Sequence, residues 1–134
     1  MKILGPTGSP HPNGPTSDMV KAFTSGATEA GHEVVCINAA HMNIKGCMAC
    51  EYCHNKGNGV CAQKDDMQEI YPEILSSDMI VFASPIYYFT MSAQLQAPIQ
   101  RIYCMNKPGK LKKMALLASS YSPNVYDGAI GEYR

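Results

Sequence analysis

The apolar run at residues 79–83, MIVFA, restricts the fold of this chain more than any other stretch. A strand with one solvated face alternates apolar and polar residues, and this run shows no alternation. It therefore predicts a strand that is buried on both faces, as in a parallel sheet with helices on either side. Ser84 and Pro85 are expected to end the strand, because proline has no N–H group to give to a central ladder.

An apolar and aromatic cluster follows the carboxyl end of this predicted strand. It consists of Ile86, Tyr87, Tyr88 and Phe89, and Ser92 is a suitable N-cap for the helix expected after it. Ligands of open α/β sheets bind in the crevice beyond the carboxyl ends of the strands. The cluster is therefore either a ledge for a flat ring or ordinary packing under the next helix, and these residues alone favour neither.

A loop rich in glycine, proline and hydroxyl residues, at 5–17, lies between a short strand that begins at Lys2 and a helix predicted over 18–30. Loop N–H groups and the helix dipole favour an anion at such a helix start. Side-chain donors are available from Ser9, His11, Asn13, Thr16 and Ser17. The loop matches neither a Walker A sequence nor G-x-G-x-x-G, so a proline-stiffened turn is the alternative to phosphate binding.

The order of the remaining segments predicts a doubly wound α/β sheet. Residues 33–38 (EVVCIN) read as a second strand with Cys36 buried in it, and a strand–helix–strand unit of this length is parallel and right-handed. A fourth strand is expected at 114–118, with Ser119 and Ser120 at the same edge as the other two loops. The last twelve residues predict the beginning of another helix. We expect one domain over 1–134, with a cysteine-rich insertion at about 44–64.

Four of the six cysteines fall in this insertion. Cys47, Cys50 and Cys53 are each separated by two residues, and Cys61 follows after seven more. Thiolates are soft ligands that select iron–sulfur clusters or zinc. The triple cysteine favours a 4Fe–4S cluster over structural zinc, which usually takes two well-separated pairs. The remaining alternative is a loop of reduced thiols without any ligand, or with one disulfide formed on exposure to air.

Composition and charge exclude several classes of protein. The formal net charge is zero, with 11 acidic and 11 basic residues, and no long basic patch points to nucleic acid. The longest aliphatic runs, at 79–83 and 114–118, are too short to span a bilayer. The first residues lack the apolar core of a signal peptide. A cytoplasmic protein is therefore expected, in which cysteines are more often metal-binding or redox-active than paired in disulfides.

Several motifs in the same order resemble one family over nearly the whole chain. They are GSPHPNGPT at 8–16, EAGHEV at 29–34, IKGCMACEYC at 44–53, Cys61 with KDDMQEIY at 64–71, and ASPIYYFTMSAQLQAPIQR at 83–101. The chain resembles the iron–sulfur flavoprotein branch of the flavodoxin-like, NAD(P)H-dependent FMN reductases. The resemblance implies a flavodoxin-like sheet in the order 2-1-3-4 and an FMN cofactor.

The resemblance also assigns residues to the cofactors. It implies that the FMN phosphate is surrounded by Ser9, His11, Asn13, Pro15, Thr16 and Ser17. It implies that the flavin ring is met by Pro85, Ile86, Tyr87, Tyr88, Phe89, Thr90 and Met91, with Ser119 and Ser120 at its polar edge. A 4Fe–4S cluster would be held by Cys47, Cys50, Cys53 and Cys61.

Three departures from the family bear on cofactor binding and assembly. Relatives commonly have arginine where His11 stands and asparagine where Pro15 stands, so a phosphate would meet less charge and one N–H fewer. Relatives carry a fifth strand after the last helix, whereas this sequence stops at Arg134, so either it is a truncated form or the sheet ends at the fourth strand. The fourth strand then has an open edge that invites pairing, and we expect a homo-oligomer in which a partner covers it.

The expected function is that of an FMN-dependent oxidoreductase or electron-transfer flavoprotein. NAD(P)H or a ferredoxin-type carrier would supply the electrons, and no acid–base dyad is expected because the flavin carries the chemistry. One alternative is a cluster-free reductase of quinones or flavins. Another is a non-enzymatic metal-binding or electron-carrier module. A low-molecular-weight phosphatase is excluded, because its first loop would need a nucleophilic cysteine and an arginine.

Overall fold

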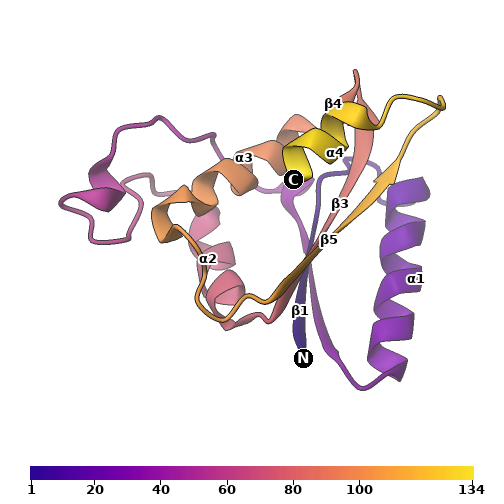
Figure 1. Ribbon diagram of the computed structural model, residues 1–134, viewed down its shortest axis with the longest axis horizontal. Helices are drawn as coiled ribbons and strands as arrows, with labels where there is room; N and C mark the ends of the chain where they lie inside the picture. Colours follow the sequence, from indigo (N-terminus) through magenta and orange to yellow (C-terminus); the bar gives the residue numbers. More distant parts are fainter.

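Four parallel strands form the centre of the computed structural model, which describes residues 1–134. In spatial order they are β2 (Glu33–Asn38), β1 (Lys2–Thr7), β3 (Met79–Tyr87) and β5 (Lys113–Ser119) (Figure 1). Counted along the chain, the parallel strands have the predicted order 2-1-3-4, and β5 is the predicted fourth strand. The outer edge of β5 has no strand partner.

The unalternated run is the central strand. Ile80, Val81 and Ala83 are all buried, and β3 pairs with β1 on one side and with β5 on the other. Helices cover both faces of the sheet, so successive side chains are apolar in whichever direction they point.

The strand is longer than predicted, because β3 continues through Pro85 to Tyr87. Pairing with β1 ends opposite Ala83, so one side of β3 needs no further N–H donors beyond that point and proline is tolerated there.

A fifth, very short strand was not predicted. β4 (Thr90–Met91) turns back antiparallel onto the end of β3, with Ile86 opposite Met91. The two residues of the turn, Tyr88 and Phe89, both have left-handed backbones, with φ of 50° and 70°. This is the pattern of a type I′ hairpin turn, which normally uses Asn-Gly.

The helices form two layers around the sheet. α1 (Pro15–Glu29) covers one face, and α2 (Met67–Ser76) and α3 (Ala93–Arg101) cover the other (Figure 1). The predicted last helix is present as α4 (Asp127–Tyr133), which lies beside α3 and β4. The main core is on the α2 and α3 side, and it is built from Leu4, Met67, Ile70, Ile74, Ile80, Phe82, Met91, Leu95 and Ala129.

Two details differ from the sequence predictions. α1 begins at Pro15, three residues earlier than predicted, because proline at the first helical position loses no intrahelical hydrogen bond. Cys36 is exposed on β2 and not buried, and its sulfur lies 3.4 Å from the hydroxyl oxygen of Thr24.

The segment between β2 and α2 contains little regular structure. It has two short 3-10 helices, η1 (Ala39–His41) and η2 (Tyr52–His54), and a third, η3 (Ile102–Met105), extends α3. We call residues 44–64 the cysteine loop. It projects beyond α2 and α3, on the side of the sheet away from α1 (Figure 1). None of the helices is long and apolar enough to cross a membrane.

Candidate functional site

An open cleft of about 470 Å³ lies where β1, β3 and β5 end. This size suits a cofactor or small-molecule site. The cleft brings together three segments that are far apart in the sequence. The sequence-predicted residues that line it are Ser9, His11, Asn13, Pro15, Thr16, Pro85, Ile86, Tyr87, Ser119 and Ser120. It is also lined by Pro12, Gly14 and Tyr121, each of which is next to a predicted residue in the sequence.

The first loop presents free backbone donors to this cleft. Ser9 is buried, and its hydroxyl oxygen accepts a hydrogen bond from the His11 N–H at 3.2 Å, which shapes the loop. The N–H groups of Asn13, Thr16 and Ser17 have no partner within the chain, and the first two of these residues line the cleft. Because α1 begins at Pro15, the last two belong to the first turn of a helix, where the dipole favours an anion.

The positive charge available in the cleft is small. None of its lining residues is lysine or arginine, so His11 is the sole side chain there that can carry a positive charge. An anion would therefore be held mainly by backbone N–H groups and hydroxyl groups.

Two hydroxyl pairs fix the opposite wall. Thr16 Oγ1 lies 2.9 Å from Ser119 Oγ, which joins the start of α1 to the end of β5. The hydroxyl oxygens of Ser120 and Tyr126 lie 3.0 Å apart, within the segment that follows β5. The first contact holds the first loop to the end of β5, and the second shapes the loop after β5.

A buried serine pair joins the first loop to the end of β3 and the start of α3. The Ser92 hydroxyl donates to the Gly8 carbonyl oxygen at 2.8 Å, and the Ser92 N–H donates to Ser84 Oγ at 2.9 Å. Ser92 occupies the predicted N-cap position of α3, but its hydroxyl caps no helical N–H. A side chain on Gly8 would collide with Ser92 Oγ and would place Cβ 2.6 Å from Leu95 Cβ. The first loop and α3 therefore touch directly.

Five predicted residues lie outside the cleft. Ser17 donates its hydroxyl to the His11 carbonyl oxygen at 3.1 Å, and Met91 is buried in the core. The Thr90 hydroxyl donates to the Glu132 carboxylate. Tyr88 and Phe89 project from the hairpin with exposed fractions of 93% and 57%. The two rings meet edge to face, with their centres 5.6 Å apart.

The four motif cysteines line a second, separate cavity. Cys47, Cys50, Cys53 and Cys61 share it with Cys104, Arg101 and parts of α3 and η3. The enclosed space is about 20 Å³, which is room for about one water molecule. No three of the His, Cys, Asp and Glu side chains converge on one metal position, as a single tetrahedral zinc would need.

Three observations nevertheless fit a thiolate-bound group. The donors are soft, and they converge on one cavity. Arg101 Nε, which is buried beside the cavity, has no hydrogen-bond partner, and an orphaned buried donor costs roughly 1–3 kcal/mol. Ala49 and Glu51 hold left-handed backbones with φ of 55° and 58°, a strain that tends to mark functional sites. A cluster would need the exposed part of the cysteine loop to move outward.

The electrostatics of the cavity keep at least one thiol protonated. Burial raises the pKa of Cys53, and the neighbouring Cys104, Glu51 and Cys61 raise it further, against a backbone hydrogen bond that lowers it. Metal ligation needs the thiolate, so binding would release this proton.

Comparison with known proteins identifies the family of this chain. The model of the NADPH-dependent FMN reductase family matches residues 1–133. An iron–sulfur flavoprotein of Archaeoglobus fulgidus is 35% identical over 102 residues, which cover 76% of this chain and 46% of that protein.

Two solved structures share the fold. The NAD(P)H:quinone oxidoreductase of Methanothermobacter marburgensis superposes with a TM-score of 0.71 at 20% identity, covering 90% of this chain and 64% of that one. An azoreductase of Bacillus anthracis gives 0.73 at 18%, covering 99% and 78%.

The matches differ in how much of each protein they cover. The chain spans about half the length of the curated relatives it matches. The family match, by contrast, includes the cleft, the cysteine loop and every strand of the sheet. The chain belongs to the NADPH-dependent FMN reductase family, and within it to the iron–sulfur flavoprotein branch.

Proposed function

We propose that the cleft binds FMN, with its phosphate at the first loop and its ring against the end of β3. The observation that carries this proposal is the pair of unpartnered N–H groups of Asn13 and Thr16, two residues beside the start of α1 that line a cleft of cofactor size. FMN supplies hydride and single-electron chemistry, and the protein binds and orients it.

The residues of the cleft divide into two groups under this proposal. The N–H groups of Asn13, Thr16 and Ser17 would bind the phosphate, and the buried Ser9 keeps the loop in the required shape. Ile86 and Tyr87 line the cleft where the ring would lie. The hydroxyls of Ser119 and Ser120 stand at the polar edge of that position.

The strained hairpin gives further support. Bulky residues rarely adopt positive φ, and strained backbone of this kind clusters at binding sites. Tyr88 and Phe89 both do so, directly beside the segment that lines the cleft, and they present apolar rings to solvent. We propose that these two rings cover the flavin when it is bound.

The chain would then act as an FMN-dependent oxidoreductase, which is the chemistry its family indicates. NAD(P)H or a single-electron carrier would be its electron donor. The cleft contains no acid–base pair at hydrogen-bond distance, and we assign no catalytic side chain. The reduced thiols suit the cytoplasm, where we place the protein.

The four motif cysteines would hold a 4Fe–4S cluster that exchanges single electrons. The cysteine loop lies on the α2 and α3 side of the sheet, whereas the phosphate loop leads into α1 on the other side (Figure 1). This separation favours exchange between two copies of the chain. The unpaired edge of β5 provides a surface where a second copy could pair.

Size-exclusion chromatography with light scattering tests the assembly. A homo-oligomer supports it, and a monomer in dilute solution would contradict it.

A cluster-free reductase of quinones or flavins is the second candidate. It is favoured by the water-sized space between the cysteines and by the absence of a converged metal position. In that case the thiols would stay reduced and the cleft alone would carry the function.

One experiment decides between these functions. The protein is purified anaerobically, its visible spectrum is recorded, and iron and acid-labile sulfide are assayed on the same sample. Flavin bands with about four irons per chain support the cluster-containing flavoprotein. Flavin bands without iron support the cluster-free reductase. Iron without flavin, even after FMN is added, would indicate a metal-binding or electron-carrier module.

A matched pair of variants makes the iron assay specific. Cys53→Ser removes a thiol of the cavity, whereas Cys36→Ser removes an exposed thiol on β2 that lies outside it. We expect loss of iron in the first variant and none in the second. Equal iron content in both would contradict ligation by the motif.

A further inference from the structure

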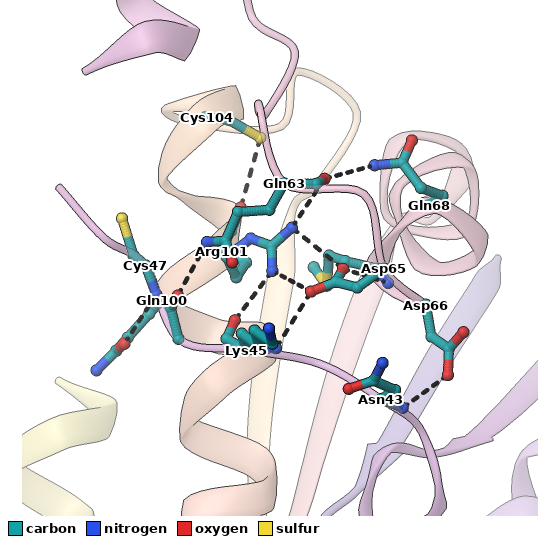
Figure 2. A network of polar contacts seen from close by, with 12 residues as sticks. Asn43, Lys45, Cys47, Gln63, Asp65, Asp66, Gln68, Gln100, Arg101 and Cys104 are labelled. Carbon is teal, nitrogen blue, oxygen red and sulfur yellow. Dashed lines mark hydrogen bonds and ion pairs between the residues drawn. The ribbon is translucent and has the colours of Figure 1, made fainter. Parts of the chain in front are cut away.

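One buried arginine joins the two ends of the cysteine loop. Arg101, the last residue of α3, is 2% exposed. Its Nη1 donates to the Lys45 carbonyl oxygen at 2.9 Å, and its Nη2 donates to the Gln63 carbonyl oxygen at 3.5 Å (Figure 2). Lys45 is the second residue of the loop and Gln63 is the second from its end.

The carboxylate of Asp65 completes this arrangement. Its two oxygens accept from Nη1 and Nη2 of Arg101 at 2.6 and 3.2 Å, which is a bidentate pair. Asp65 also accepts from the Lys45 N–H at 3.2 Å, so each partner of the ion pair holds the beginning of the loop (Figure 2).

Two glutamine side chains add hydrogen bonds at the base of the cysteine loop. Gln63 Nε2 donates to the Gly46 carbonyl oxygen at 3.0 Å, from one end of the loop to the other. Gln100 Oε1 accepts from the Cys47 N–H at 3.3 Å. These bonds join the base of the loop to itself and to α3, and none of them involves a cysteine sulfur or a bound group.

The rest of the loop is held to the fold at Tyr103 of η3. The Tyr103 hydroxyl donates to Glu51 Oε1 at 2.8 Å, and the Tyr103 carbonyl oxygen lies 3.0 Å from His54 Nε2. Most residues between 47 and 61 are exposed, and none belongs to the hydrophobic core. The base of the cysteine cavity is therefore held by buried polar contacts, and its outer part by contacts at the surface.

Arg101 also contributes charge to the cavity itself. It is the one cationic side chain among the residues that line the cavity, and its Nε–H lacks a partner. A cluster bound by four thiolates is anionic and becomes more so when reduced. The guanidinium is paired with Asp65, and without it that carboxylate would stand unneutralised near the cluster. Arg101 would therefore favour the reduced form, since cluster potentials depend on nearby charge and hydrogen bonds.

We propose that Arg101 is a positioning residue of the cysteine site, which closes the base of the loop before any cluster is present and raises the potential of the bound cluster. The second part rests on the proposed function, and the first part does not. Lysine cannot replace Arg101 in the closure, because an ammonium group lacks the planar fork that reaches three acceptors at once.

The closure is tested on iron-free full-length protein by amide hydrogen exchange. In the wild type, we expect the amides of Lys45 and Cys47 to be protected although both residues are exposed. Arg101→Lys and Arg101→Gln should each speed exchange of these two amides at least tenfold. Lys45→Gln, which removes an exposed cation but keeps the backbone contacts, should leave it unchanged. Unprotected wild-type amides, or unchanged exchange in both Arg101 variants, would overturn the closure.

The charge effect is tested by redox titration of the iron-loaded proteins. Arg101→Gln should lower the midpoint potential, whereas Arg101→Lys should stay nearer the wild type and lose iron faster to a chelator. An unchanged potential in Arg101→Gln would overturn this role. A wild type that takes up no iron would overturn the proposed cluster and with it the charge effect, while the exchange data would still decide the closure.

Discussion

The side chains of Thr16 and Ser119 meet at 2.9 Å between their hydroxyl oxygens, although 103 residues separate them in the sequence. Thr16 is buried in the first turn of α1, and Ser119 is the last residue of β5. The contact joins the first loop to the opposite wall of the cleft, so the width of the cleft depends on this contact.

Replacing Thr16 by valine removes this hydroxyl with little change in shape. We expect a loss of about 1 kcal/mol in the free energy of unfolding, as for one hydrogen bond, and weaker FMN binding. Unfolding in urea and a titration of FMN fluorescence measure the two effects. Ser25→Ala on the exposed side of α1 is the control and should change neither. Unaltered affinity in Thr16→Val would show that the two walls are held by other contacts.

Gly8 is a position where a single methyl group should be destabilising. The added Cβ would meet Ser92 Oγ and Leu95 Cβ, both of which are buried, so Gly8→Ala should lose about 1–3 kcal/mol by overpacking. Gly26→Ala in α1 is the matched control, because its Cβ position has no atom within 4 Å apart from its chain neighbours and the backbone of its own helix. It should gain up to about 1 kcal/mol from helix propensity. Two variants of equal stability would contradict the close approach of the first loop to α3.

His11→Arg should strengthen FMN binding. The cleft lacks lysine and arginine, and a guanidinium can bind a phosphate through two hydrogen bonds. We expect about tenfold tighter binding, roughly 1.4 kcal/mol, together with a steeper dependence on salt. His32→Arg, at the far end of α1, controls for net charge. Equal affinities for both variants would place the phosphate elsewhere.

Tyr88→Gly should separate stability from binding. Glycine adopts φ of 50° without strain, so the variant should be about 1 kcal/mol more stable, while losing the ring proposed to cover the flavin. FMN affinity should fall as the unfolding midpoint rises. Tyr121→Gly, another fully exposed tyrosine, should not gain stability.

Asp65 should control stability in acid. Burial alone would raise the pKa of this carboxyl, but hydrogen bonds from Arg101 and from the N–H groups of Lys45 and Met67 outweigh it and lower the pKa below its usual value. The stability it contributes is complete above the unfolded pKa of about 3.9 and is lost as the pH falls through the lower folded value.

Asp65→Asn removes this contribution at neutral pH. Loss of one partner of a buried ion pair should cost about 3–5 kcal/mol, and the acid unfolding curve below pH 4 should become shallower. Urea unfolding at a series of pH values measures both effects. Glu29→Gln, on the exposed surface of α1, should keep the wild-type curve. A steep acid limb in Asp65→Asn would mean that other carboxylates set it.

The sheet could be predicted from the sequence because each parallel strand is a local pattern. The run at 79–83 was sufficient to place β3 at the centre, and the loops after β1 and β3 fell at the expected edge. The hairpin at Tyr88 and Phe89 could not be predicted, because its turn uses two aromatic residues at positive φ where sequence rules expect Asn-Gly. The strain is local, and the packing that tolerates it comes from the whole fold.

The two candidate sites differ in how many of their residues could be predicted from the sequence. Ten of the predicted FMN residues line one cleft, since they follow strand ends that a parallel sheet brings together. The four cysteines share a cavity, as their spacing indicated, but Arg101 and Cys104 in that cavity are some forty residues beyond the motif. No local pattern links them to it. They are found there because α3 packs beside the loop.

The base of the cysteine loop has a consequence for biosynthesis. None of the residues between 47 and 61 belongs to the hydrophobic core. None of the hydrogen bonds that close the base involves a cysteine sulfur. The fold of the loop base therefore does not depend on a metal. If the motif binds the proposed cluster, the polypeptide would fold first and receive iron and sulfide later, and an iron-starved cell would accumulate a folded apoprotein that can be refilled without new protein synthesis.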